Sequence, residues 1–315
     1  MREPIFFQPI FQERIWGGDE LKTFGYDIPS SKTGECWAFA AHDNGQSIVK
    51  NGTYTGKTLG ELWQSNRELF GGIEGDRFPL LTKILDANDD LSVQVHPNDT
   101  YAFTHENGEL GKTECWYIVD SKPGAEIILG HTAQSKEEFI QKVEDGQWNE
   151  LLQKVPVKQG DFFFVPSGTI HAIGKGIVIL ETQQNSDTTY RVYDYDRTDD
   201  NGNKRELHIT KSIEVSTIPH HASEVNIEVT KIEDLTIITF VRDRYFTVQK
   251  WHLSGTAKQQ QNEPFQLVSV MEGAGTITVS NGDHFPFTKG DHFLLPSNLG
   301  EFNLEGNCEC MVSFL

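Results

Sequence analysis

The sequence has little cysteine: four residues among 315, at Cys36, Cys115, Cys308 and Cys310. No two of them form a CxxC pair, and they are too few and too scattered for the disulfide framework of a secreted domain. Cys36 and Cys115 each lie between Glu and Trp, and Cys308 and Cys310 alternate along an expected strand. The sequence therefore predicts small buried thiols rather than cysteines that bind metal or carry out redox chemistry.

Positive charge and long apolar runs are also scarce. There are 27 Lys and Arg against 46 Asp and Glu, so the formal net charge is −19 and the pI is about 4.9. Such a charge disfavours nucleic acid and anionic membranes, and an anionic small substrate needs a locally positive site. No apolar run approaches a membrane span, and residues 1–16 lack the apolar core of a signal peptide. We expect a soluble cytoplasmic protein with neither nucleic acid nor membrane as a partner.

A repeated pattern indicates two domains of one kind. Residues 160–167 (GDFFFVPS) are matched by residues 290–297 (GDHFLLPS), each a glycine-aspartate turn, an apolar strand and a proline turn. Two copies of one all-β barrel or jelly roll are predicted, and the chain is long enough for each to have its own core. The polar, proline-bearing residues 218–224 mark the expected boundary. Short helices are expected over residues 58–70, 135–146, 148–154 and 207–215.

Residues 91–117 carry the strongest functional signal. The strand expected at residues 91–96 alternates apolar and polar side chains, so Gln94 and His96 share one face. Glu114 lies where a loop enters the next strand, and His171 follows the proline turn of the first copy. A lone histidine beside a proline is usually a half-exposed strand residue. Together, however, Gln94, His96, Glu114 and His171 make a four-donor metal shell.

The second copy lacks matching donors. Extending the alignment of the two copies places Glu301 opposite His171, and residues 275–279 offer hydroxyls where the first copy has Gln94 and His96. Hydroxyls and a single carboxylate make a poor zinc shell. We therefore expect one metal ion per chain, held in the first domain, and a second domain that serves as a scaffold.

Five segments follow one another along the chain in a recognisable order: residues 11–18, 92–99, 112–114, 166–172 and 181–191. Together they resemble the type I mannose-6-phosphate isomerases (phosphomannose isomerases) of the short bacterial class, which have the cupin fold. The resemblance covers essentially the whole chain, which lacks room for the additional helical domain of longer members. It implies a mainly β fold of two cupin-type β-barrel or jelly-roll domains with a few inserted helices. Residues 1–220 would form the catalytic metal-binding domain and residues 221–315 a degenerate domain without a metal site.

The resemblance also implies an activity, which is the zinc-dependent interconversion of mannose 6-phosphate and fructose 6-phosphate by proton transfer through an enediol. Gln94, His96, Glu114 and His171 fall at the zinc-ligand positions, with one zinc ion per chain. Arg191 falls at the active-site arginine position, and Lys112 and Glu181 match pocket positions. All three are expected to be catalytic.

Lys112 and Arg191 would supply the positive charge that a phosphorylated hexose needs on a protein of this net charge. Strand alternation predicts that Arg191 shares a face with Thr189 and Tyr193. Glu181 ends an apolar strand, where burial would raise its pKa toward that of a usable base. Its alternative role is that of a structural partner of Arg191 in a buried ion pair.

Two other classes of function stay open at this point. Two histidines and one carboxylate also bind iron in oxygenases of the same fold, and oxygen consumption with strict iron dependence would identify that class. The other is a non-catalytic sugar-phosphate sensor, for which saturable binding without turnover would be the mark. The preferred hexose phosphate, the general base and the oligomeric state also stay open.

Overall fold

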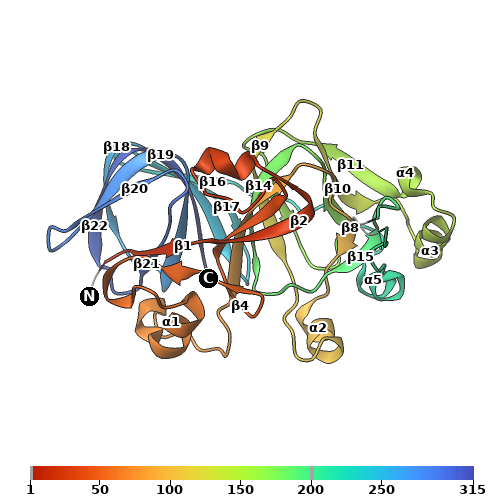
Figure 1. Cartoon of the computed structure of the whole chain (residues 1–315), viewed down its shortest axis with the longest axis horizontal. Helices are drawn as coiled ribbons and strands as arrows, with labels where there is room; N and C mark the ends of the chain where they lie inside the picture. The colour runs from red at the N-terminus through yellow and green to blue at the C-terminus, as the bar shows by residue number, and fades with distance from the viewer. Residues whose placement is uncertain (1–2, 199–201) are drawn as a thin grey trace.

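The computed structural model describes residues 3–198 and 202–315 and is built mostly of strands, so the predicted fold class is confirmed. Two lobes lie side by side along the long axis of the molecule (Figure 1). The short helices are α1 (Leu59–Ser65), α2 (Asp99–His105), α3 (Lys136–Glu144), α4 (Trp148–Leu151) and α5 (Ile209–Val215), with 3-10 helices at Glu20–Phe24, Gly52–Tyr54 and Arg67–Phe70. Among the described residues, no helix is long and apolar enough to cross a membrane.

The first lobe consists of two antiparallel sheets. The six-stranded sheet has the order β12 (Phe162–Val165), β9 (Glu114–Ser121), β14 (Ile177–Gln184), β7 (Leu80–Ala87), β3 (Thr33–Phe39) and β2 (Ile10–Gly18). The five-stranded sheet has the order β11 (Leu152–Pro156), β10 (Glu126–His131), β13 (His171–Ile173), β8 (Val93–Val95) and β15 (Tyr190–Tyr193). One buried cluster joins the two sheets, with Trp116 and Ile179 from the first and Ile127 and Ile173 from the second. Both sheets therefore turn one face toward a shared interior.

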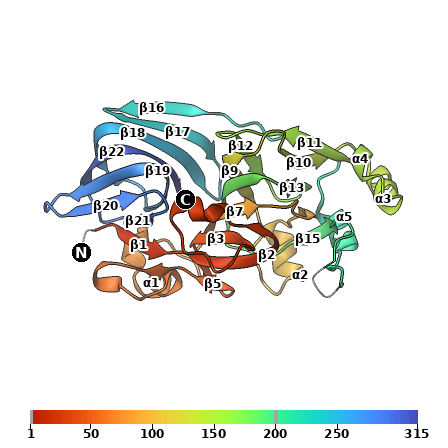
Figure 2. The same ribbon diagram turned by 45° about the horizontal axis from the view of Figure 1, so that its top comes forward.

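The second lobe is one nine-stranded sheet that also contains the start of the chain (Figures 1 and 2). Its order is β16 (Glu228–Ile232), β17 (Leu235–Arg242), β18 (Thr247–Gln260), β22 (Glu301–Phe314), β19 (Phe265–Val279), β21 (His292–Pro296), β1 (Ile5–Gln8) and β6 (Ile48–Val49), with β20 (His284–Thr288) on β19. The remaining strands, β4 (Ala41–His42) and β5 (Gly45–Gln46), form a separate hairpin. Ile5 of β1 pairs with Leu294 of β21. The chain thus begins in the second lobe and then enters the first, and the domain boundary near residue 220 stays a prediction.

Local signals in the sequence explain where helices begin and end. Thr58 and Glu61 form the predicted capping box of α1, and Ser135 caps α3. The helix expected over residues 148–154 was predicted too long. It stops at Leu151 because the next residues pair with β10 as strand β11, so sheet formation overrides local helix preference.

The interior of the second lobe is mostly apolar, and among the described residues it holds no group of three or more metal donors. Ile277 and Val279 are buried there, whereas the Thr278 hydroxyl contacts His284 at an exposed position. Glu301 is also exposed, and it pairs with Lys258 at 3.1 Å. All four cysteines are free and buried, as predicted.

A substitution at Phe7 tests how much β1 contributes to the stability of the fold. Its side chain is 1% exposed and meets the Phe39 ring edge-on at 5.7 Å. We expect Phe7→Ala to lower the free energy of unfolding by about 3–5 kcal/mol, because the substitution leaves a cavity in a packed core. Phe103→Ala is the control, since Phe103 is 70% exposed, and its effect should stay within about 0.5 kcal/mol. Urea unfolding measures both, and equal effects would contradict a packing role for β1.

Candidate metal centre and its surroundings

Three strands of the five-stranded sheet bring predicted site residues into one row. Gln94 of β8 pairs directly with His171 of β13 on one side and with Arg191 of β15 on the other. Directly paired residues share a face of the sheet, so the three side chains point into the same interior. His96 follows directly after β8, and Glu114 opens β9 in the opposite sheet. The structure thus brings all four predicted ligands together between the two sheets.

A glycine turn holds His171 in place. Gly168 has φ of +86°, a left-handed conformation that other residues rarely adopt, and a Cβ there would lie 2.6 Å from the Thr217 hydroxyl. Its backbone N–H donates to the carbonyl of His96 at 2.9 Å. The turn before His171 is therefore tied directly to another predicted ligand.

The donor atoms of His96, Glu114 and His171 lie within 4.8 Å of one another, and all three residues are buried. The Nε2 atom of His96 is 3.6 Å from Glu114 Oε2, and that of His171 is 3.4 Å from Glu114 Oε1. Apart from Lys112 Nζ, which lies 2.5 Å from Oε2, no hydrogen-bond donor reaches the carboxylate oxygens of Glu114. A buried carboxylate with an unpartnered oxygen is costly, and a cation placed among these donors would satisfy it.

Both imidazoles are oriented for binding a cation. His96 Nδ1 donates to the carbonyl of Thr188 and His171 Nδ1 donates to that of Thr169, each at 2.8 Å. A carbonyl oxygen can only accept, so the proton sits on Nδ1 and the Nε2 lone pair faces Glu114. Burial, and then the positive charge of Lys112, lowers the pKa of His96 well below its ordinary value and that of His171 to about 4. Both rings are neutral at neutral pH, as metal binding requires.

Gln94 completes the set from the side of His171. Its Nε2 atom lies 3.4 Å from His171 Nε2. Which amide atom faces the imidazole is an assignment, and a half-turn of the amide presents its oxygen instead. The side chain can therefore donate to the imidazole or offer an oxygen to a cation.

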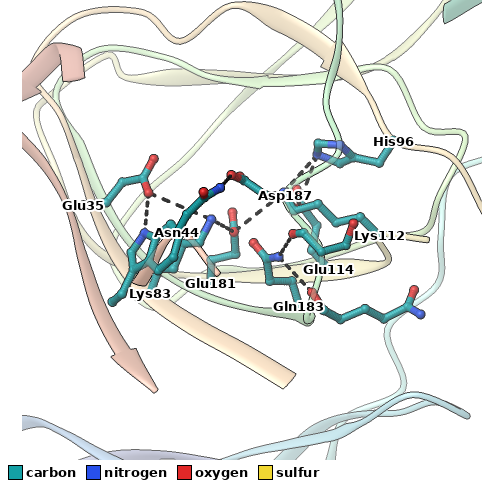
Figure 3. Close-up of polar contacts among 12 residues, drawn as sticks. Glu35, Asn44, Lys83, His96, Lys112, Glu114, Glu181, Gln183 and Asp187 are labelled. Carbon is teal, nitrogen blue, oxygen red and sulfur yellow. Dashed lines mark hydrogen bonds and ion pairs between the residues drawn. The ribbon is translucent and has the colours of Figure 1, made fainter. Parts of the chain in front are cut away.

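A chain of alternating charges extends from Glu114 across the interior of the first lobe (Figure 3). Lys112 Nζ lies 2.5 Å from Glu114 Oε2 and 3.8 Å from Glu181 Oε1. Lys83 Nζ lies 3.8 Å from Glu181 and 3.9 Å from Glu35. Each buried carboxylate in this chain therefore has a cation beside it, which makes burial of the charges tolerable.

This series of alternating charges shows which groups surround Glu181. Its ion partners are Lys83 and Lys112, so the alternative of a buried pair with Arg191 is wrong. Burial first, and then the charges of Glu114 and Glu35, raise the pKa of Glu181 above its ordinary value although Lys112 and Lys83 lower it. Burial lowers the pKa of Lys112, but the charges of Glu114 and Glu181 outweigh this effect and leave it above the ordinary lysine value. Glu181 is thus a stronger base than a free glutamate, and Lys112 stays charged.

A cavity of about 230 Å³ opens beside the donor cluster. Its charged lining comprises five cations and three anions, which leaves two net positive charges on a protein of net charge −19. These residues are Arg14, Lys83, Lys112, Arg191, Arg205, Glu35, Glu181 and Asp187. The cavity is therefore the locally positive site that an anionic substrate requires.

Sequence reasoning missed five of these eight residues, namely Arg14, Glu35, Lys83, Asp187 and Arg205. For Lys83 a signal existed, because it is the one charged residue within the apolar run at residues 78–85. The partly buried pair of Arg14 and Glu35, at 2.9 Å, links β2 with β3, and no periodic pattern in the sequence predicts it.

Arg191 lies in the cavity as predicted, but its neighbours on β15 differ from expectation. Thr189 also lines the cavity. Tyr193 instead stacks on Trp148 at 4.4 Å, because the ladder between β15 and β8 shifts register between Arg191 and Tyr193. Such a bulge changes the direction in which the next side chain points, and the alternation of residues in the sequence does not reveal the bulge.

The second lobe reaches this site through a relay of hydrogen bonds. Tyr245, in the turn between β17 and β18, donates to Asp99 Oδ2 at 2.6 Å. Gln184 Nε2 donates to Asp99 Oδ1, and the backbone N–H of Thr113 donates to Gln184 Oε1, both at 2.9 Å. Thr113 lies between the two charged residues of the centre, so the second lobe holds the segment that carries them.

Comparisons with known proteins agree along the whole chain. The family model "Phosphomannose isomerase type I, catalytic domain" matches residues 5–119, and "Mannose-6-phosphate isomerase, cupin domain" matches residues 236–315. The chain is 63% identical to mannose-6-phosphate isomerase ManA of Bacillus subtilis, over 99% of both chains. It is 55% identical to the mannose-6-phosphate isomerase of Streptococcus mutans, over 99% of this chain and 98% of the other. A crystal structure of a Bacillus subtilis mannose 6-phosphate isomerase superposes with a TM-score of 0.97 at 53% identity, with 99% of each chain covered.

Lys112 should stabilise the fold by neutralising buried carboxylates. In metal-free protein we expect Lys112→Met to lower the free energy of unfolding by about 3–5 kcal/mol, because Glu114 loses its nearest cation. Arg77→Met is the matched control, since Arg77 pairs with Glu109 at 2.5 Å but is 49% exposed, and it should cost about 1 kcal/mol or less. Urea unfolding of chelator-treated protein decides this. Equal costs would show that the buried charges are already balanced without Lys112.

Proposed function

This chain belongs to the type I mannose-6-phosphate isomerases, and from that premise we propose that it interconverts mannose 6-phosphate and fructose 6-phosphate. The observation that carries the proposal is the placement of a buried His-Glu-His donor cluster beside a cationic cavity. An aldose-ketose interconversion moves one proton between neighbouring carbons through an enediol. It needs a base, a stabiliser of the developing oxyanion, and charges that hold the phosphate.

Zinc fits the donor set best. His96 and His171 would offer neutral nitrogen atoms, Glu114 a carboxylate and Gln94 its amide oxygen, a mixed shell that suits this ion. The Oε1 atom of Glu114 supports this assignment, since the ion pair with Lys112 is made through Oε2 and leaves Oε1 without a hydrogen bond. When bound, zinc supplies a Lewis acid for the sugar oxygens.

Glu181 is the base in this proposal. It takes the proton from C2 of open-chain mannose 6-phosphate and returns it to C1, while the C2 hydroxyl loses its proton and the C1 oxygen gains one, so that C2 becomes the ketone and C1 the alcohol. Its raised pKa, which burial causes, supports the role. Lys112 stays protonated and lies close to both Glu114 and Glu181. Its ammonium group can therefore donate a hydrogen bond to the oxyanion that forms.

Lys112 and Arg191 balance the negative charge of the substrate. Arg191 is half-buried and donates to the hydroxyl of Ser92 at 3.2 Å and to the carbonyl of Glu206 at 2.8 Å. Both acceptors are neutral, so its charge remains available for a phosphate. Hexose phosphates are charged and do not cross a bilayer unaided, and we therefore place the reaction in the cytoplasm.

Metal content is the first test. We expect about one zinc per chain in the purified protein, because only one donor cluster occurs in the described part of the chain. The double variant His96→Ala with His171→Ala should lose the metal while melting as a folded protein. Elemental analysis decides this, with Glu301→Ala as the control that keeps its zinc. Two equivalents per chain, metal surviving the double substitution, or iron with oxygen consumption would contradict the proposal.

Glu181→Gln should lower kcat by about 10²–10⁴-fold, the usual contribution of a general base, because an amide cannot accept the proton. Zinc content should be unchanged, since Glu181 is not among the donors. An isomerase assay coupled to fructose 6-phosphate detection measures the rate. Glu301→Ala, an exposed residue of the second lobe, should stay within a few-fold of the parent. Parent-like turnover in Glu181→Gln would assign the base to another group.

A further inference from the structure

Two guanidinium groups line the cavity at the end of the five-stranded sheet. Arg191 lies on β15, and Arg205 lies on the segment that leads from β15 to α5. Sequence reasoning assigned a role to Arg191 alone. Arg205 is 27% exposed, so its charge is only partly screened by water.

Asp194 holds Arg205 in a fixed orientation. The buried carboxylate accepts from Arg205 Nε at 2.8 Å and from Nη2 at 2.5 Å, a bidentate arrangement that sets the plane of the guanidinium group. The same carboxylate accepts from Arg197 Nη2 at 2.6 Å. Arg197 also pairs with Asp89 at 3.6 Å, whereas Asp194 is the acidic partner that holds Arg205 and is shared with Arg197, so the charge of Arg205 is only partly balanced.

Arg191 has no acidic partner among the described residues. Its side-chain donors go to the neutral oxygens of Ser92 and Glu206. Burial, followed by the positive charge of Arg205, lowers the pKa of Arg191. Two cations that repel each other across one cavity are stabilised by an anion placed between them. A phosphate monoester carries between one and two negative charges at neutral pH and three acceptor oxygens, so it suits this pair.

The spacing along the sheet agrees with a hexose phosphate. Arg191, Gln94 and His171 occupy one row across three neighbouring strands. Neighbouring strands lie about 4.8 Å apart, so the row spans about 10 Å from the arginine to the donor cluster. That is the scale of an extended six-carbon sugar phosphate, with the phosphate at Arg191 and the reacting carbons at the donor cluster, where His171 lies.

We propose that Arg205 is a second phosphate-binding residue, which binds the 6-phosphate group together with Arg191. The pair makes the enzyme selective for phosphorylated over free sugars. The inference rests on the proposed isomerase function. Arg205 makes its contact at the end of the substrate remote from the reacting carbons. It therefore contributes to binding of substrate and transition state alike, and its loss raises KM more than it lowers kcat.

The chain offers a matched pair of variants. Arg205→Ala and Arg197→Ala each remove one of the two guanidinium partners of Asp194, but only Arg205 lines the cavity. We expect Arg205→Ala to raise KM for mannose 6-phosphate by about tenfold to a hundredfold, the loss of a charged hydrogen bond, with kcat within a few-fold. Arg197→Ala should leave KM within about threefold. Arg205→Lys keeps the positive charge but loses the two parallel N–H donors of the guanidinium group, so it should give an intermediate KM.

Inorganic phosphate probes the same contact without turnover. As a competitive inhibitor, or as a titrant in calorimetry, it should bind Arg205→Ala about tenfold more weakly than the parent and Arg197→Ala as the parent does. Equal effects of the two alanine variants on KM and on phosphate binding would overturn the inference and assign Arg205 a structural role. The proposed function would then stand, because the parent still isomerises mannose 6-phosphate. A parent without turnover that still loses phosphate affinity on Arg205→Ala would overturn the proposed function alone.

Discussion

The buried carboxylate of Glu114 is the group on which the rest of the first lobe depends. A negative charge without hydrogen bonds in a protein interior is destabilising by several kcal/mol unless cations or a metal lie beside it. The surrounding structure supplies this compensation through Lys112 at 2.5 Å, and the two imidazoles, whose lone pairs face the same point, would hold a metal cation there. Lys112 in turn requires Glu181, and the alternation of charges continues through Lys83. The cost of burying one carboxylate thus accounts for the further charged groups around it.

The second lobe contributes to the site as well as to stability, although its apolar interior suggests a scaffold alone. The second lobe has an apolar interior and no donor cluster in the described residues, which agrees with a scaffold. Yet Tyr245 connects it through Asp99 and Gln184 to the backbone of Thr113. Backbone position at Thr113 sets where Lys112 and Glu114 point, so a scaffold of this kind also determines the geometry of the site. A substitution that weakens apolar packing in the second lobe therefore differs from one that breaks these hydrogen bonds, because only the second would move Thr113 directly.

The sequence was sufficient for features that are local or repeated. The capping box at Thr58, the alternation around Gln94 and the repeated glycine-aspartate turn each reflect a short-range constraint, and the structure has each of these features, although the helix expected over residues 58–70 ends at Ser65 before a 3-10 turn and the strand expected at residues 91–96 spans Val93–Val95. Contacts that depend on assembled sheets could not be predicted. The charge of Lys83 stands out in the sequence, but its partner Glu181 is set only by the pairing of β7 with β14, and the bulge that turns Tyr193 away depends on pairing with β8. The pairing of β1 with β21 joins opposite ends of the chain, where no local pattern operates.

That last pairing has a consequence for how the protein is made. Residues 5–7 are apolar and buried, but their partner strand begins at His292, close to the end of the chain. At about 5–20 residues per second, a ribosome needs on the order of half a minute to deliver that partner after β1 has emerged. During this time β1 is paired on one side only, with the two-residue strand β6, and its other edge is an open apolar strand edge that chaperones can bind. A chain that terminates before β21 never covers this edge, so the long separation of β1 and β21 exposes truncated copies to quality control.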